Sequence, residues 1–297
     1  GRRTQMKPVI FGEVLFDCFA SGERVLGGAP FNVAWHLTAF GADPLLVSCV
    51  GYDDEGQAIL ARMEQWQMRR TGMQISDAAP TGRVQVSIVD REPHYDIVKP
   101  AAWDLIDARR VPVLTSLPFI YHGTLALRDV ISRQAFRRLQ QETTAPLFMD
   151  VNLRDPWWQP ETVWPLLEQA SWIKLNADEL QQLLPDVLTE TARIEHCLRL
   201  PRLQQLLLTK GAAGAELYQA DGDCQRVAPQ VNAATFVDAV GAGDAFTSVF
   251  LLGMLHGWDS ALTLQRAQRF ASAIVGIRGA TIDEPSFYQP FRTEWGV

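Results

Sequence analysis

Short apolar runs that alternate with helix-like segments limit the fold of this chain more than any other feature of its sequence. The runs have the length of buried strands and occupy residues 8–15, 45–50, 119–123, 147–151, 172–175 and 206–209. Segments typical of helices follow several of them, including residues 132–141. Strands separated by helices favour a parallel sheet that is covered on both faces. We therefore predict an α/β fold, a three-layer α/β/α sandwich around a mainly parallel central sheet.

Residues 82–100 depart from this alternation. Two short strands are expected at residues 84–89 and 95–98, linked by residues 90–93 without a helix, which is the pattern of a hairpin. Together with residues 12–28 they are expected to form a small β-sheet lid over the main sheet. The chain has 297 residues, of which 47% are hydrophobic, and no linker is visible. We expect a single domain over residues 1–297 that carries this lid.

Composition argues against several classes of partner. The formal net charge is −7 and no basic run is visible, so we expect neither nucleic acid nor a membrane as a partner. Cysteines at positions 18, 49, 197 and 224 form no C-x-x-C pair and indicate reduced thiols. The first residues lack the apolar core of a signal peptide, and no segment reaches the roughly 18 apolar residues of a membrane span. A cytoplasmic location is expected.

A glycine-rich turn before a long apolar run gives the strongest functional signal. Gly241–Ala242–Gly243 is followed by Asp244, and most of residues 245–255 are apolar. If residues 244–256 form a helix, the free N–H groups at its start can bind an anion. Asp244 would stand beside that anion, in ionised form at neutral pH, and could accept the proton of a hydroxyl that attacks a phosphate. The alternative is a structural helix that merely begins with glycine.

A second glycine pair opens a helix-like run near the N-terminus. Gly27 and Gly28 precede Pro30, a residue suited to the first turn of a helix, and Asn32 follows in that turn. Upstream, Asp17 stands near the end of an apolar run, where an unpaired carboxylate would be costly to bury. Both polar residues are candidates for ligand binding. A turn acid and an ordinary polar helix residue are the alternatives.

Polar residues also gather where later strands end. They are Asn152 and Arg154, then Asn176 and Glu179, then Thr209, Lys210 and Gly211. In doubly wound sheets, ligands bind at the edge formed by the carboxyl ends of the strands. Structural alternatives are an ion pair for Arg154, a capping box for Asn176 and Glu179, and a plain strand exit for residues 209–211.

Several phosphate-binding motifs are absent. The sequence contains no G-x-x-x-x-G-K-[ST] and neither the His-Arg-Asp nor the Asp-Phe-Gly motif of protein kinases. Gly241 and Gly243 also lack the third glycine of the dinucleotide fingerprint. A phosphate site built on residues 238–244 must therefore belong to another class.

Two segments resemble the signatures of the ribokinase-like (PfkB) family of carbohydrate kinases. Residues 27–56 are similar to its N-terminal signature, and Asp238 with residues 241–244 to its C-terminal signature, about 200 residues later. One departure is Ala239, where relatives often have threonine. Another is the lack of an Asn-Ala-Ala-like run before residues 278–280. The resemblance covers almost the whole chain and implies a sugar kinase on a ribokinase-like fold.

The resemblance also implies roles for the candidate residues. Asp244 corresponds to the catalytic base, and Gly241, Ala242 and Gly243 to the anion hole. The implied substrate-binding residues are Asp17, Gly27, Gly28, Asn32, Asn152 and Arg154. The implied nucleotide-side residues are Asn176, Glu179, Thr209, Lys210 and Gly211. Glu179 is linked to Mg²⁺ and Asp238 to the vicinity of a monovalent cation such as K⁺, and ATP is the expected cosubstrate.

Within the family, residues 12–17 and 150–154 are most similar to fructokinases. The expected reaction is ATP-dependent phosphorylation of a primary hydroxyl of fructose or a related ketose. Because Arg154 offers a fixed cation, a 2-keto-3-deoxy sugar acid is an alternative substrate. A non-catalytic sugar sensor on the same fold is an alternative from another class. Relatives often dimerise through the lid, so a homodimer is expected.

Overall fold

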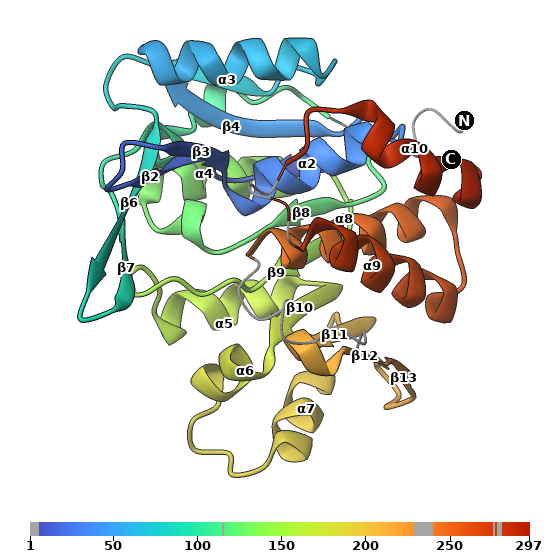
Figure 1. The fold of residues 1–297 in the computed structure, drawn as a ribbon. Coiled ribbons are helices and arrows are strands. Elements are labelled where there is room, and N and C mark those ends of the chain that lie inside the picture. The colour runs from blue at the N-terminus through green and yellow to red at the C-terminus, as the bar shows by residue number, and fades with distance from the viewer. Residues whose placement is uncertain (1–5, 115, 229–239, 276, 278–280) are drawn as a thin grey trace.

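The computed structural model describes residues 6–114, 116–228, 240–275, 277 and 281–297. Within these residues a nine-stranded sheet runs through the molecule in the order β13-β12-β11-β10-β9-β8-β1-β4-β5 (Figure 1). Its strands are β1 (Val9–Phe11), β4 (Leu45–Gly51), β5 (Met73–Ser76), β8 (Ile120–His122), β9 (Leu147–Asp150), β10 (Trp172–Asn176), β11 (Gln205–Thr209), β12 (Ala215–Gln219) and β13 (Cys224–Val227).

Seven neighbouring strands, from β11 to β5, are parallel, whereas β12 pairs antiparallel with β11 and β13 antiparallel with β12 at one edge. In the middle of the sheet Val9 lies opposite both Leu45 and Ile120. The parallel strands are apolar on both faces, as expected where helices cover both sides. The predicted fold class, including a small additional sheet, is confirmed.

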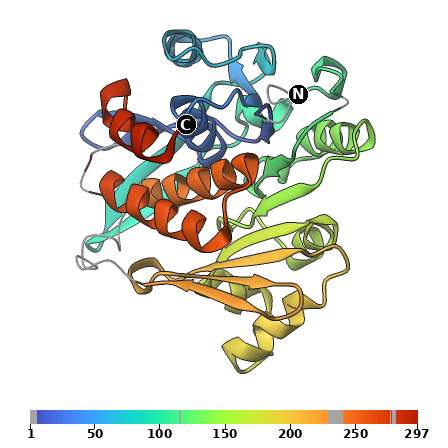
Figure 2. The same ribbon diagram turned by 90° about the vertical axis from the view of Figure 1, so that its right-hand side faces the viewer.

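Helices form a layer on each face of the large sheet (Figure 2). One layer contains α2 (Ala29–Ala39), α3 (Asp54–Gln65), α8 (Val240–His256), α9 (Ser260–Ile274) and α10 (Pro285–Trp295). The other contains α4 (Val130–Gln141), α5 (Pro160–Gln169), α6 (Ala177–Leu183) and α7 (Glu190–Leu198). Strand alternation separates the two cores, because Ile10 packs with the first layer whereas Val9 and Phe11 pack with α4. No described helix has the length and apolar character needed to cross a bilayer.

The second sheet has four strands, in the order β3-β2-β6-β7. They are β2 (Leu15–Phe19), β3 (Arg24–Gly27), β6 (Gly82–Val89) and β7 (Glu92–Ile97). The sequence predicts one strand over residues 8–15 with Asp17 near its end, and this is wrong. The run is divided between β1 and β2, because Gly12 adopts a φ of 153° and a side chain there would clash with Pro30. Asp17 therefore lies in the middle of β2.

The hairpin of the second sheet is tighter than predicted. Val89 lies opposite Glu92, so the turn consists of Asp90 and Arg91, which both have positive φ values of 51° and 67°. A two-residue turn of this kind matches the twist of paired strands. Strand β7 begins at Glu92 and includes Pro93, which is tolerated because β7 is an edge strand. Figure 1 shows this hairpin projecting from the body of the molecule.

Candidate active site

The start of α8 lies beside the start of α2, and a hydrogen bond joins them. The Asn32 side-chain amide donates to an Asp244 carboxylate oxygen over 2.8 Å, across 212 residues of sequence. Both residues are buried, with 3% and 6% of their surface exposed. Helix α8 begins at Val240, four residues earlier than predicted, so Gly241, Ala242 and Gly243 belong to its first turn. Their N–H groups are among those that lack intrahelical acceptors and can bind an anion.

Gly243 offers space at this helix end. A Cβ atom added there would meet no described atom within 4 Å, so packing against the described residues does not require glycine. Ala242, by contrast, is fully buried in the core below α8. Among the described residues, the first turn of α8 is therefore packed at Ala242 and unobstructed at Gly243.

Asp244 has a pKa that differs from the sequence-based expectation. Burial raises the pKa from 3.8 to about 6 and outweighs the hydrogen bond from Asn32, which lowers it. The carboxylate of Asp150 raises it further, whereas Lys174 and Arg154 lower it. Because α8 begins at Val240, Asp244 lies beyond its first turn and not at the helix start as predicted, so the helix end adds little to the stability of its anionic form. At pH 7 most of Asp244 is still ionised, and a base with a pKa near the working pH is well suited to accept a proton.

The start of α2 depends on Gly28. Its φ is 99°, and a Cβ atom would lie 2.8 Å from the carbonyl oxygen of Glu13. Glycine lets the chain approach this closely, so that the N–H of Asn32 can donate to the Gly28 carbonyl oxygen over 2.9 Å. A Cβ atom on Gly27 would lie 3.5 Å from a carboxylate oxygen of Asp17. Asp17 therefore faces the same end of α2 from the second sheet.

Arg154 supplies positive charge to this side of the site. It is exposed and forms no ion pair within the part of the chain that the structure describes. Its charge lowers the pKa of Asp17, whose burial acts in the opposite direction and raises the pKa overall. Nearby, Asn152 has a positive φ of 42°, a conformation that non-glycine residues adopt at an energetic cost. The structural ion pair considered for Arg154 is not seen among the described residues.

The predicted nucleotide-side residues follow β10 and β11. Asn176 caps α6 by accepting from the N–H of Glu179, whose carboxylate accepts in turn from the N–H of Asn176. The second oxygen of Glu179 accepts from the N–H of Leu153 over 2.6 Å. The capping box considered from the sequence is therefore present. It also ties the start of α6 to the loop that carries Arg154.

Lys210 is held in place by two acids. Its ammonium lies 2.5 Å from Glu190 on α7 and 3.2 Å from Glu216 on β12. These contacts raise the pKa of Lys210. Thr209 pairs with Asn176 across the β10–β11 ladder, and Gly211 has a positive φ of 51°. The strand exit at residues 209–211 thus lies beside the start of α6. The predicted cation-site residue Asp238 is outside the described residues.

Four buried polar residues were not among the predicted site residues. Glu13, at the corner between β1 and β2, is 3% exposed, and one of its carboxylate oxygens has no hydrogen-bond partner. Burial raises its pKa to about 7. Tyr121, Asp150 and Lys174 form a contact group on β8, β9 and β10. Each is a polar residue in or just after an apolar strand, and that is the signal by which sequence reasoning could have found it.

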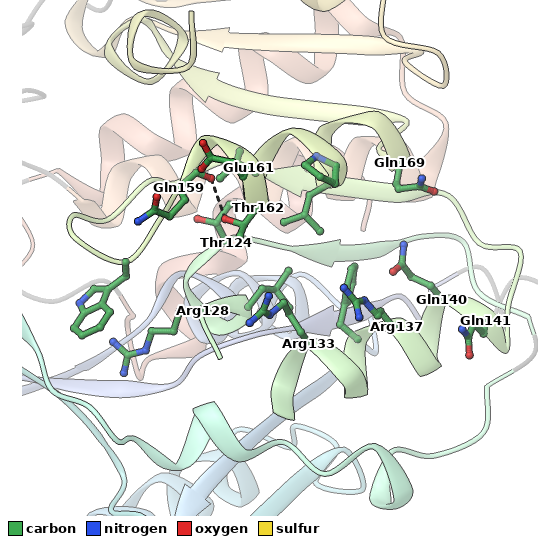
Figure 3. Close-up of a pocket in the computed structure, with 16 residues that line it drawn as sticks. Thr124, Arg128, Arg133, Arg137, Gln140, Gln141, Gln159, Glu161, Thr162 and Gln169 are labelled. Atoms are coloured by element: carbon green, nitrogen blue, oxygen red, sulfur yellow. Dashed lines mark hydrogen bonds between the residues drawn. The ribbon is translucent and has the colours of Figure 1, made fainter. Parts of the chain in front are cut away.

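A separate cleft of about 540 Å³ lies between α4 and α5 (Figure 3). Arg133, Arg137 and Gln140 line it from α4, and Glu161 and Thr162 line it from α5. It contains none of the predicted site residues. The candidate active site is therefore the buried group at the starts of α2 and α8, and not this cleft.

Amide N–H groups beside a buried carboxylate are the kind of groups that phosphoryl transfer to a hydroxyl uses. A model of the pfkB family carbohydrate kinases matches residues 17–286. The chain belongs to this family and is a phosphotransferase with an alcohol group as acceptor.

Named relatives agree with this assignment. A fructokinase of Klebsiella pneumoniae is 29% identical over 268 residues, which cover 84% of each chain. Probable fructokinase-2 of Arabidopsis thaliana is 27% identical over 294 residues, which cover 89% of this chain and 87% of the relative. The crystal structure of a fructokinase with bound ATP from Xylella fastidiosa has a TM-score of 0.84 at 22% identity and covers 99% of this chain and 100% of that chain. The chain is thus a sugar kinase similar to fructokinases.

Proposed function

We propose that the protein transfers the γ-phosphate of ATP to a primary hydroxyl of fructose or a related ketose. Asp244 acts as general base, and the amides of Gly241, Ala242 and Gly243 receive the negative charge of the transferred group. The observation that carries the proposal is the buried Asn32–Asp244 hydrogen bond at the start of α8. This bond fixes the Asp244 carboxylate close to the first turn of α8, the only described helix start that carries this glycine-rich motif.

The proposed reaction places few demands on covalent chemistry. The hydroxyl oxygen attacks the γ-phosphorus, its proton passes to Asp244, and the bond from the γ-phosphorus to the bridging oxygen breaks to release ADP. Phosphoryl transfer depends chiefly on positioning and charge stabilisation. General-base catalysis contributes roughly 10²–10⁴-fold, and one fixed donor for the developing charge about 3–4 kcal/mol.

Asp17, Gly28 and Asn32 are proposed to hold the sugar from the side of α2, together with Asn152 and Arg154. This proposal is supported by the approach of Asp17 to Gly27 and by the unpartnered side-chain oxygen of Asn32. A buried acceptor without a partner is costly, and a sugar hydroxyl would satisfy it. The second sheet would then act as a lid that contributes Asp17 within a single domain.

ATP is proposed to bind at the ends of β10 and β11, near Asn176, Thr209 and Gly211. Both oxygens of Glu179 already accept backbone hydrogen bonds, and the described residues contain no group of three or more potential metal-ligating side chains. Mg²⁺ that arrives with ATP would therefore be held mainly by phosphate oxygens and water, with Glu179 as a nearby anion. It would neutralise charge on the phosphates. A K⁺ site near Asp238 remains part of the proposal.

A second candidate substrate is a 2-keto-3-deoxy sugar acid, and the absence of an ion pair at Arg154 in the described structure favours it. A guanidinium without an acid partner can bind a substrate carboxylate. A panel of fructose, ribose and 2-keto-3-deoxygluconate in an ATP-dependent turnover assay separates the two substrates. We expect the largest kcat/KM for fructose. A preference for the sugar acid would favour the second candidate if Arg154→Gln abolishes that preference. Binding of a sugar without turnover of any sugar would favour a sensor.

We also propose that the protein is a homodimer assembled through the second sheet. Ile88, Val89 and Tyr95 on the β6–β7 hairpin are 76%, 50% and 59% exposed. Apolar side chains grouped on an exposed edge hairpin favour association with a partner. A second copy of this chain would cover them and would close the edge at β7.

A further inference from the structure

Three polar side chains form a buried row on the sheet below the start of α8. Tyr121, Asp150 and Lys174 belong to the neighbouring strands β8, β9 and β10, and Asp150 pairs with Lys174 across the ladder. The residues beside them in each strand pack in the cores on the opposite face. Strand alternation therefore directs all three side chains to the α8 face. Tyr121 shares its core with Ala242 in the first turn of α8.

Direct contacts connect the row. The Tyr121 hydroxyl donates to one oxygen of Asp150 over 2.7 Å, and the Lys174 ammonium lies 3.4 Å from the other. The side chains of Lys174 and Asp150 are 11% and 5% exposed. Replacing a buried ion pair by apolar residues is often neutral or stabilising. Fold stability alone therefore gives a weak reason for these charges at this position.

Asp150 and Lys174 carry the charges that shift the pKa of Asp244 most. Among the groups that act on the Asp244 carboxyl, Asn32 on α2 is neutral, Arg154 in the loop after β9 is cationic, and Asp150 and Lys174 belong to the row. Asp150 raises the pKa of Asp244, and Lys174 lowers it. Glu13, from the corner after β1, is a further buried acid whose own pKa Asp244 raises. The Lys174 ammonium thus opposes the effect of the Asp150 carboxylate on the pKa of Asp244.

We propose that Asp150 and Lys174 are positioning residues that keep Asp244 ready to take the proton of the attacking hydroxyl, with Tyr121 holding the Asp150 carboxylate in place. The inference rests on the proposed role of Asp244 as general base. It assigns no contact between the row and the substrate. The charges of Asp150 and Lys174 act through Asp244, so changing either one shifts the pH at which the base becomes active.

The first test is the pH dependence of kcat in Asp150→Asn, Lys174→Met and the double variant. We expect the acid limb of Asp150→Asn to move down by about one pH unit, because a nearby like charge is removed. The limb of Lys174→Met should move up, and that of the double variant should lie close to the unmodified protein. Tyr121→Phe retains both charges but loses the hydrogen bond that holds the Asp150 carboxylate, so its limb should move by less than the limbs of the two charge variants. Identical limbs in folded Asp150→Asn and Lys174→Met would overturn the inference.

A second readout does not depend on turnover. The free energy of unfolding is measured against pH for each variant, once with Asp244 and once with Asp244→Asn added. The pH range over which the free energies of these two proteins diverge reports the titration of Asp244 in that variant. Shifted titrations without turnover of any sugar would sustain the coupling and reject the proposed function. Turnover with unshifted titrations would sustain the function and reject the coupling. Circular dichroism identifies any variant that does not fold.

Discussion

At Asp244, burial and the hydrogen bond from Asn32 act in opposite directions on the pKa of the same carboxyl. Sequence reasoning identified the residue but placed it at the start of its helix, and it could not weigh the loss of solvation, which depends on how the tertiary fold buries the carboxyl. The resulting pKa of about 6 leaves the acid ionised at neutral pH yet able to hold a proton. A carboxylate with a pKa near 4 would be a weaker acceptor for the proton of a sugar hydroxyl.

The raised pKa makes a prediction for stability. Because the folded pKa of Asp244 exceeds the unfolded value, its protonated form favours the folded state, and this contribution is lost as pH rises from about 4 to about 6. The free energy of unfolding of Asp244→Asn should therefore rise relative to that of the unmodified protein as pH increases through this window. Above about pH 6 the relative gain should reach roughly 3 kcal/mol. Urea unfolding at a series of pH values measures the difference. A difference that does not change between pH 4 and pH 7 would contradict the raised pKa.

Among the secondary-structure elements, α2 can begin where it does because residue 28 is glycine. A side chain there faces both a positive φ and the carbonyl oxygen of Glu13. Gly22 is a matched control, since its φ is 88° but no atom lies within 4 Å of the Cβ position. We expect Gly28→Ala to lower the free energy of unfolding by about 1–3 kcal/mol more than Gly22→Ala, and also to lower kcat/KM by moving Asn32. Equal losses of stability in urea unfolding would show that the close approach is unimportant.

Six strands of the parallel sheet could be predicted because each is a local apolar run with polar residues after it, whereas β5 alternates in burial and was not predicted. Helices α5, α7 and α10 were not predicted, and prolines within α5 and α10 weaken their periodic patterns. Of α6 only the start was anticipated, as a capping box at Asn176 and Glu179. The division of residues 8–15 between two sheets depends on the conformation of Gly12. Contacts such as those of Lys174 with Asp150 require the strand order, which no local pattern contains.

For the molecule as a whole, the exposed hairpin residues predict association. Sedimentation velocity at micromolar concentration should show a dimer, and Ile88→Lys with Tyr95→Lys should shift it to monomer because charges on the apolar surface oppose burial. Leu188→Lys is a suitable control, since Leu188 is 89% exposed and lies outside the second sheet. A monomer in the unmodified protein, or a dimer unaffected by the hairpin changes, would contradict assembly through this sheet.

The most direct test of the central claim is the rate of ATP-dependent phosphorylation by Asp244→Asn on the best sugar of the panel. Asn keeps the size of the side chain and removes the base, so we expect kcat to fall by roughly 10²–10⁴-fold while sugar binding changes little. Asp186→Asn, an exposed acid away from the site, should keep its full rate. A kcat for folded Asp244→Asn within a few-fold of the unmodified protein would contradict the assignment of Asp244 as the general base.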